Sequence, residues 1–391
     1  MGDRYDVIVV GAGVMGASSA FHLAQRGLKV ALVDKKTIGE GPSGQSSAIV
    51  RQHYSNELTA RMALHSLRVF EDFEEQIGEG CGFEPVGFVV LVDDKDREGL
   101  EANIAFQQQL GIEAEMLSPE ALRDLLPGME LGDLVAAAYE AKSGYADPYQ
   151  TVNAYVRAAR RLGVELYRET RVTAIRMVRG KVSGVEMGSE RLDAPQVLNC
   201  TGAWSAALAA TAGAGLPIHA CRVQVAFFRR PPGHEASHPV VGDFANAVYF
   251  RPETGNLTLV GLIDPAEAEA IVNPDDFDTR MDPEFLLDAG GRLVSRYPAM
   301  DEAESTGGYA SLYAITPDWH PIVDEVPPGS GLYICSGFSG HGFKLSPAIG
   351  LMMADLVTGT SPPAFDPYLF RLDRFAQADP VRGRYEYGIV G

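Results

Sequence analysis

The sequence predicts an α/β protein with two domains, a discontinuous Rossmann-like dinucleotide-binding domain and an α+β domain built on an antiparallel sheet. Three observations lead to this prediction. A buried strand, a glycine-rich turn and an apolar helix open the chain at residues 5–26. Alternating strands separated by Pro and Gly turns occupy residues 216–325. A strand, a glycine-rich loop and a helix follow from Leu332 onward, so the first domain resumes near the C-terminus.

The opening unit carries a dinucleotide-binding pattern. Residues 5–10 are mostly apolar, as expected for a parallel strand buried on both faces. Gly11 permits a tight turn, Gly13 lets the backbone approach a pyrophosphate, and Gly16 lets the helix pack on the strand. Asp34 closes the second strand, where an acid can accept bonds from a ribose hydroxyl. The alternative is a glycine-rich turn in an ordinary α/β domain.

A loop rich in hydroxyl groups favours FAD over a nicotinamide cofactor. Residues 41–54 read Gly-Pro-Ser-Gly-Gln-Ser-Ser-Ala-Ile-Val-Arg-Gln-His-Tyr and directly follow the strand that ends at Asp34. An extended FAD would run its pyrophosphate and ribityl chain past such a loop. A nicotinamide dehydrogenase would usually continue into another βαβ unit instead. A solvent-exposed turn is the alternative for this loop.

The remaining elements follow from periodicity. Helical patterns and strands alternate in the middle of the chain; the helices are expected near 56–78, 96–110, 118–126 and 149–162, and the strands within 81–94, 164–187 and 196–200. After the loop 337–344, a last helix is expected to begin with Ser346 as its N-cap and Pro347 in its first turn. The FAD-binding domain should therefore comprise residues 1–80, 145–215 and 326–391, and the substrate-binding domain residues 81–144 and 216–325.

Composition excludes several classes of function. The 391 residues carry 33 basic and 52 acidic side chains, a net charge of −19, which disfavours nucleic acid and anionic membranes as partners. No apolar run is long enough for a membrane span, and no signal peptide is apparent. Four scattered cysteines form neither a disulfide framework nor a metal site. We expect a cytoplasmic protein without a metal.

Three further motifs resemble those of a known protein family, and the resemblance extends over nearly the whole chain. They are Asn199-Cys-Thr-Gly-Ala-Trp204, Thr316-Pro-Asp-Trp-His-Pro-Ile322 and Gly337-Phe-Ser-Gly-His-Gly-Phe-Lys-Leu-Ser-Pro347. Together with the N-terminal pattern, they resemble the D-amino-acid oxidase superfamily, and within it the sarcosine oxidases of monomeric or beta-subunit type and the glycine oxidases. The resemblance implies an extended FAD with its isoalloxazine between the two domains.

The resemblance also implies which residues contact FAD. The adenosine and pyrophosphate contacts fall on Gly11, Gly13, Gly16, Asp34, Ser46 and Ser47. The backbone of Val172 matches the position that reaches the adenine, and Thr201 and Gly202 match the turn under the cofactor. The loop beside the flavin ring corresponds to Gly340, His341, Gly342 and Phe343.

Two cationic residues are implied as a clamp for a substrate carboxylate. Arg51 and Lys344 match the pair that holds the carboxylate of an N-methyl amino acid in sarcosine oxidase. An Arg fork binds a carboxylate in a bidentate manner, and a Lys supplies a second point charge. Lys344 is also the only lysine after Lys181. Tyr313 matches a pocket tyrosine of the family. In each case the alternative is a structural role.

Three departures from the family pattern refine the prediction. Members with covalent FAD place a cysteine at the position of Ser311, so we expect non-covalent FAD. Glycine oxidases have arginines where this chain has Tyr313 and Gly340, which favours the clamp of sarcosine oxidases. Monomeric sarcosine oxidase activates oxygen with a substrate-domain lysine, but no lysine lies between Lys181 and Lys344. The identity of the electron acceptor therefore stays open.

The function expected is oxidation of the C–N bond of a secondary amino acid, such as sarcosine, an N-carboxymethyl amine or an imino acid. The bond is broken by hydride transfer to FAD and hydrolysis of the resulting imine. The expected partner is thus a small amino-acid substrate with a carboxylate. The alternatives are a flavoprotein subunit that passes electrons to an acceptor other than oxygen, and a nicotinamide-dependent dehydrogenase. The sequence does not predict the oligomeric state.

Overall fold

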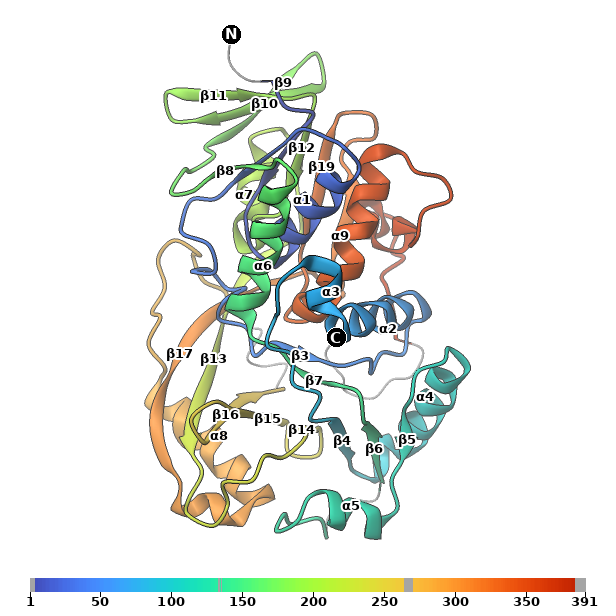
Figure 1. Ribbon diagram of the computed structural model, residues 1–391, viewed down its shortest axis with the longest axis vertical. Coiled ribbons are helices and arrows are strands. Elements are labelled where there is room, and N and C mark those ends of the chain that lie inside the picture. Colours follow the sequence, from blue (N-terminus) through green and yellow to red (C-terminus); the bar gives the residue numbers. More distant parts are fainter. Residues whose placement is uncertain (1–3, 133, 135, 264–269, 384–391) are drawn as a thin grey trace.

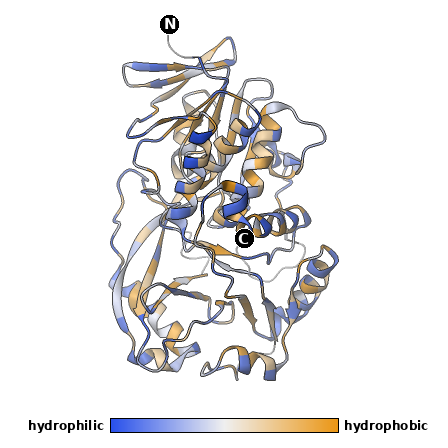
Figure 2. Ribbon diagram, viewed as in Figure 1, coloured by the Kyte–Doolittle hydropathy of each residue, from blue (hydrophilic) through white to orange (hydrophobic). Residues whose placement is uncertain are grey.

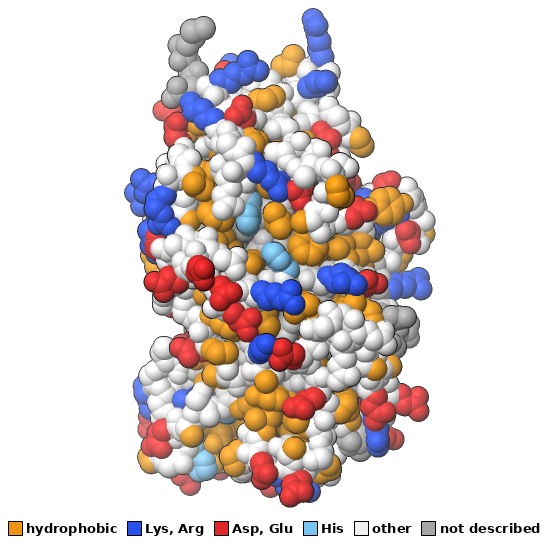
Figure 3. Space-filling model, turned by 45° about the vertical axis from the view of Figure 1, so that its right-hand side comes forward, with side chains coloured by type: hydrophobic (Ala, Val, Ile, Leu, Met, Phe, Trp, Pro, Cys, Tyr) orange, Lys and Arg blue, Asp and Glu red, His pale blue; other side chains and the backbone are white. Residues whose placement is uncertain are grey.

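The computed structural model describes residues 4–132, 134, 136–263 and 270–383. Figure 1 shows two stacked units, which we call the upper and the lower unit, each built on its own large sheet. In Figure 2, hydrophobic residues concentrate on the strands and on the helices packed against them. On the face in Figure 3, acidic and basic side chains are intermixed, so the net charge of −19 is not gathered into one patch there.

Six strands form the sheet of the upper unit. Their spatial order is β18 (Ile322–Glu325), β19 (Leu332–Ser336), β12 (Gln196–Asn199), β1 (Val7–Val10), β2 (Val30–Val33) and β8 (Glu165–Tyr167). All neighbours pair in parallel except the edge strand β18, which runs antiparallel to β19. Strands β1 and β2 are buried along their whole length, as both faces of a doubly wound sheet require.

Helices pack around this sheet. They are α1 (Val14–Gln25), α2 (Glu57–Glu71), α3 (Phe73–Ile77), α6 (Pro148–Arg161), α7 (Ser205–Ala210) and α9 (Gly342–Thr358). Helix α1 packs against both α6 and α9. A Cβ on Gly350 would lie 2.1 Å from the Ser18 hydroxyl, so only glycine lets α9 approach α1 this closely. A small sheet of β9 (Ala174–Val178), β10 (Lys181–Met187) and β11 (Glu190–Asp193) completes the unit.

Eight strands form the sheet of the lower unit. Their order is β17 (Glu304–Ile315), β13 (His219–Arg229), β16 (Leu257–Leu262), β15 (Val248–Glu253), β14 (Val240–Asp243), β4 (Phe88–Val92), β6 (Ala136–Glu140) and β5 (Glu115–Met116). Helix α8 (Pro283–Arg296) packs on β13, β15 and β16. The other described helices of this unit are α4 (Arg97–Gln109) and α5 (Pro119–Leu125), with short 3₁₀ turns at Asp94–Asp96 and Pro298–Glu302. The 3₁₀ turns at Gly202–Trp204, Pro367–Phe370 and Leu372–Arg374 lie with the upper sheet.

The predicted fold class is confirmed, with one correction to the second sheet. It is not purely antiparallel, because β4 and β14 pair in parallel. These two strands come from separate stretches of the chain, so no hairpin dictates their relative direction. Strand β18 lies within the range 216–325 of the predicted substrate-binding domain, yet it pairs with β19 in the upper sheet. The other domain boundaries stay predictions.

The start of the last helix is also corrected. Helix α9 begins at Gly342 with His341 as its N-cap, so Ser346 and Pro347 lie inside the helix and not at its start. The missing N–H of Pro347 interrupts the regular ladder, and side chains of α1 and α2 bond to the helix backbone on either side of it. The Ala348 amide donates to the Ser66 hydroxyl at 3.3 Å, and the Ser18 hydroxyl donates to the Ser346 carbonyl at 2.8 Å.

Within the described residues, no helix is both long and apolar enough to cross a membrane.

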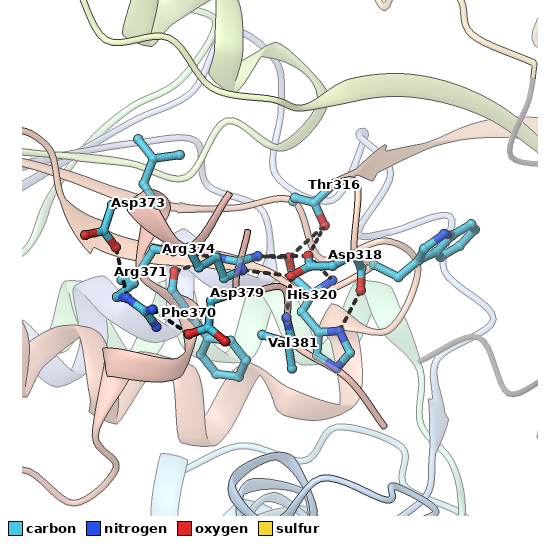
Figure 4. Close-up of polar contacts among 12 residues, drawn as sticks. Thr316, Asp318, His320, Phe370, Arg371, Asp373, Arg374, Asp379 and Val381 are labelled. Atoms are coloured by element: carbon cyan, nitrogen blue, oxygen red, sulfur yellow. Dashed lines mark hydrogen bonds and ion pairs between the residues drawn. The ribbon is translucent and has the colours of Figure 1, made fainter. Parts of the chain in front are cut away.

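A buried ion pair ties the C-terminal segment to the loop after β17 (Figure 4). Arg374 is fully buried, and its Nε and Nη2 atoms donate to the two carboxylate oxygens of Asp318 at 2.8 and 3.0 Å. Its remaining N–H groups donate to backbone carbonyls of residues 320, 370 and 371. Asp318 also accepts from the Val381 amide at 2.9 Å. This Asp318–Arg374 network fixes the loop that carries Trp319.

The charge of Asp318 depends on this partner. Burial alone would raise the pKa of the Asp318 carboxyl, but the bonds from Arg374 outweigh it and hold the pKa below its ordinary value. A depressed folded-state pKa means that the ion pair stabilises the fold at neutral pH. That contribution is lost as the pH falls through the folded-state pKa.

Replacing Arg374 by Met should lower the free energy of unfolding at pH 7 by about 3–5 kcal/mol, because a buried carboxylate loses its partner. In urea unfolding series, the difference from the parent should shrink in acid, where Asp318 becomes protonated. Arg280→Met is the control, because that side chain is 86% exposed and should leave the urea midpoint unchanged. A parent-like midpoint for Arg374→Met at pH 7 would contradict the assignment.

Candidate active site

The turn between β1 and α1 has no room for side chains at its three glycines. A Cβ on Gly11, whose φ is +98°, would lie 2.5 Å from the carbonyl oxygen of Cys200. On Gly13 it would lie 2.8 Å from the Ser43 hydroxyl, and on Gly16 it would lie 1.8 Å from the Gly11 carbonyl oxygen. The bare backbone lets a phosphate group approach the N-terminal end of α1, where the Val14 amide donates to the Ser43 hydroxyl at 3.0 Å. The geometry of the turn thus fits the pyrophosphate of a dinucleotide.

Asp34 holds this turn from the end of β2. One carboxylate oxygen accepts from the Ala12 amide at 2.7 Å, and the other accepts from the Lys36 amide at 2.8 Å. Burial raises the pKa of Asp34, against the lowering effect of these two bonds. At the end of β12, Asn199 accepts from both the amide and the hydroxyl of Thr201, and Gly202 follows with φ +57°. The carboxyl ends of β2 and β12 therefore flank the glycine turn.

The hydroxyl-rich loop is held against the lower unit. The Gln45 backbone carbonyl accepts from the Tyr309 hydroxyl at 2.7 Å, and its side-chain oxygen accepts from the Ser311 hydroxyl at 2.9 Å. Arg251 donates to the Ser47 carbonyl at 2.6 Å. Beyond the loop, β3 (Ile49–Val50) pairs with β7 (Gly144–Tyr145), so the chain enters the interface between the two units directly before Arg51.

A cavity lies at this interface and contains about half of the predicted site. It encloses about 1030 Å³ of atom-free space, part of it open to solvent. Its lining includes the predicted residues Ser46, Ser47, Arg51, Tyr313, Gly340, His341, Phe343 and Lys344. The other predicted residues lie elsewhere: Gly11, Gly13, Gly16, Asp34, Val172, Thr201, Gly202 and Gly342 do not line it. A Cβ on Gly342 would lie 2.9 Å from both Met15 and Phe338, so its space is taken by packing.

Arg51 and Lys344 lie together in the cavity. They are only 9% and 7% exposed, and both face the ring of Tyr54, at 4.8 Å for the Arg51 Cζ and 6.0 Å for the Lys344 Nζ. The Arg51 guanidinium also donates to the His53 carbonyl. Burial, and next the charge of Arg51, hold the pKa of the Lys344 ammonium well below its ordinary value. A buried site with two cationic groups will attract an anion.

Tyr313 forms one wall of the cavity. A Cβ on Gly340 would lie 2.4 Å from its ring, so Gly340 lets the ring pack flat against the loop. Burial, and then the neighbouring Tyr249, raise the pKa of the Tyr313 phenol well above its ordinary value. The phenol therefore stays protonated and able to donate a hydrogen bond.

His341 lies beside the clamp with a defined tautomer. Its Nε2 contacts the Trp319 carbonyl at 2.7 Å, so this nitrogen carries the proton and donates. Its Nδ1 is buried without a hydrogen-bond partner among the described residues. Burial, and then the charges of Lys344 and His320, keep the pKa of His341 far below its ordinary value, so the ring is neutral.

The backbone of Trp319 has a φ of +61°, which is a strained conformation for a bulky residue. The Asp318–Arg374 network holds the loop in this conformation (Figure 4).

Sequence reasoning missed several lining residues. They include Phe88, Gln224, Phe244, Tyr249 and Trp319. Tyr249 lies on β15, where a strand tyrosine gives no signal of its own. One signal was present in the neighbouring strand, because a Cβ on Gly261 would lie 2.3 Å from the Tyr249 hydroxyl. A glycine inside a strand pattern indicates a close approach of another group.

Comparison with known proteins agrees with this architecture. The family model described as "DAO: FAD dependent oxidoreductase" matches residues 6–356. Sarcosine oxidase subunit beta of Rhodobacter capsulatus is 25% identical, over 99% of this chain and 92% of its own length. Monomeric sarcosine oxidase of Streptomyces avermitilis is 29% identical, over 92% and 96%. The crystal structure of L-proline dehydrogenase from P. horikoshii superposes with a TM-score of 0.89 and 25% identity, over 97% of this chain and 100% of that chain.

The family predicted from the motifs is thus confirmed, and with it the FAD cofactor. The match covers both units, from β1 to near the end of α9. The chain belongs to the DAO family of FAD-dependent oxidoreductases.

Proposed function

We propose that this protein oxidises the C–N bond of a secondary amino acid that carries a free carboxylate. The observation that carries the proposal is the pairing of Arg51 and Lys344 in one cavity, over one tyrosine ring. In a chain with a net charge of −19, two buried cations at the same place indicate selection for an anionic ligand. An Arg fork and a Lys point charge suit a carboxylate.

The same two charges favour the reactive form of the amine. A cationic ammonium beside Arg51 and Lys344 is repelled, so the bound amine is expected to be neutral. A neutral amine carries the lone pair that drives hydride loss from the adjacent carbon. The Tyr313 phenol lies in the same cavity, where it is hydrogen-bonded to Tyr249 and stays protonated. The resulting imine is hydrolysed by water to an amine and a carbonyl product.

FAD would supply the electron acceptor when bound. Gly11, Gly13 and Asp34 would hold its adenosine and pyrophosphate half, with Val172, Thr201 and Gly202 nearby. Ser46 and Ser47 would also contact that half, and the loop 340–343 would lie beside the flavin ring. Ser311 offers a hydroxyl that donates to Gln45, and a hydroxyl cannot form a thioether. We therefore propose non-covalent FAD.

A second candidate is a dehydrogenase subunit that passes its electrons to an acceptor other than oxygen. It is favoured by the absence of lysine between Lys181 and Lys344 in the sequence. Relatives at similar identity include both oxidases and a sarcosine dehydrogenase, so they do not discriminate between the two.

The purified protein should be yellow and should lose its colour without air when a secondary amino acid is added. A panel of N-methyl, N-carboxymethyl and cyclic amino acids, read by flavin absorbance, identifies the substrate. Rapid return of the flavin colour in air indicates an oxidase. Slow return in air indicates a dehydrogenase that uses another electron acceptor. Bleaching by amines without a carboxylate, but not by this panel, would contradict the proposal.

Replacing either Arg51 or Lys344 by Met should raise KM for carboxylate substrates about 10- to 100-fold, because one charged hydrogen bond is lost. The FAD content should stay the same, since the proposed cofactor contacts remain. Lys181→Met, an exposed lysine in β10, is the matched control and should behave like the parent. Parent-like kinetics in both clamp variants would rule the clamp out.

Affinity for a carboxylate ligand without an amine should fall as the pH rises. Lys344 binds the anion only when protonated, and its pKa is depressed, so the loss should begin below the ordinary range of lysine. The titration can be followed through the flavin spectrum with an aromatic carboxylate. Lys344→Met should abolish the alkaline decrease, and Lys344→Arg should move it to higher pH. An unchanged profile in Lys344→Met would assign the titration to another group.

A further inference from the structure

A segment of the lower unit reaches the nucleotide edge of the upper unit. Residues 270–279, here called the strap, are attached at both ends to the lower sheet. The Val272 amide donates to the Ala220 carbonyl, and the Arg222 amide donates to the Ala270 carbonyl, each at 2.9 Å. At the other end, the Ala310 amide donates to the Thr279 carbonyl at 2.9 Å. Between these anchors, Asn273 and Asp276 pair in a tight turn that carries Asp275.

Asp275 contacts three donors of the upper unit. Its carboxylate accepts from the Lys35 ammonium at 2.8 Å, from the Arg171 guanidinium at 3.0 and 3.2 Å, and from the Trp204 indole N–H at 2.8 Å. The Lys35 ammonium also lies 3.5 Å from the centre of the Trp204 ring. These three residues come from three separate segments, and one carboxylate binds them all.

The three donors lie at the carboxyl ends of the strands of the upper sheet. Lys35 follows β2, Arg171 follows β8, and Trp204 follows β12. Strand β1 lies between β12 and β2 in the sheet, and its carboxyl end leads into the glycine turn. Asp275 therefore connects the strand ends on both sides of that turn. In open α/β sheets a dinucleotide lies in the crevice at this edge.

We propose that the strap is a further part of the FAD site, contributed by the lower unit, and that Asp275 closes it over the adenosine half of the cofactor. The residues that resemblance assigns to this half are direct neighbours of the donors, since Asp34 precedes Lys35 and Val172 follows Arg171. FAD leaves only after the three contacts to Asp275 have opened.

The charges at this site are consistent with a neighbouring pyrophosphate. An isolated carboxylate would repel it, but Lys35 and Arg171 compensate for the charge of Asp275. Hydrogen bonds from Arg171, and then from Lys35, lower the pKa of Asp275, which stays ionised. The side chains of Lys35, Arg171 and Asp275 are 21%, 56% and 43% exposed, so salt will screen these contacts.

The test is the rate at which the holoenzyme releases FAD, measured as free-flavin fluorescence after dilution. Asp275→Asn should release FAD about tenfold faster, because the charged contacts to Lys35 and Arg171 are lost. Asp278→Asn is the matched control, since Asp278 lies in the same strap but its side chain pairs with the exposed Arg280. Equal release rates in Asp275→Asn and the parent would overturn the proposal.

A salt series and a second variant separate a closing contact from a general loss of stability. Rising salt should accelerate FAD release from the parent but change Asp275→Asn little. Trp204→Phe keeps an aromatic ring at this position but removes the indole N–H, so its release rate should lie between those of the parent and Asp275→Asn. A parent rate independent of salt, or a parent-like rate in Trp204→Phe, would count against the strap. These readouts do not depend on the substrate proposed above.

Discussion

The close approach of three backbone segments at the glycine turn fixes the core of the upper unit. Gly11 touches the backbone at Cys200, Gly16 touches Gly11, and Asp34 binds the amide between them. These contacts fix α1 relative to β1, β2 and β12. Helix α9 then packs on α1 at Gly350, and the start of α9 carries His341 and Lys344. The turn proposed to hold the nucleotide thus also positions Lys344, one half of the proposed carboxylate clamp.

The interface between the two units brings the other half of the clamp into place. The chain passes from the hydroxyl-rich loop through β3 to Arg51, and β3 pairs with β7 at the edge of the lower unit. Tyr309 and Ser311 hold the same loop from β17. Burial and the charge of Arg51 hold the pKa of Lys344 well below its ordinary value, so an anion bound beside it would raise that pKa.

The sequence was sufficient for local features and insufficient for contacts between distant segments. The glycine turn, Asp34 and the approximate helices follow from spacing, because these patterns reflect local geometry. The prediction that Arg51 and Lys344 share one site came from the family resemblance. The hydrophobic periodicity of a sequence cannot show that two residues so far apart in the chain lie together. The parallel pairing of β4 with β14, the position of β18 and the lining residues Tyr249 and Trp319 depend on tertiary packing. Pro347 misled the prediction because the hydroxyl of Ser66 satisfies the helix backbone from outside.

The order of strands in the upper sheet has a consequence for how the protein is synthesised. Strand β1 is translated before both of its neighbours, β2 and the much later β12, and β12 in turn pairs with the still later β19. The glycine turn cannot reach its final packing until Cys200 has been translated, and the Trp319 loop waits for Arg374. The nascent N-terminal segment therefore leaves one edge of β1 unpaired until β12 has been translated, and one face of α1 uncovered until α9 follows. Such exposed segments are natural clients of chaperones, and domains with distant pairings fold slowly.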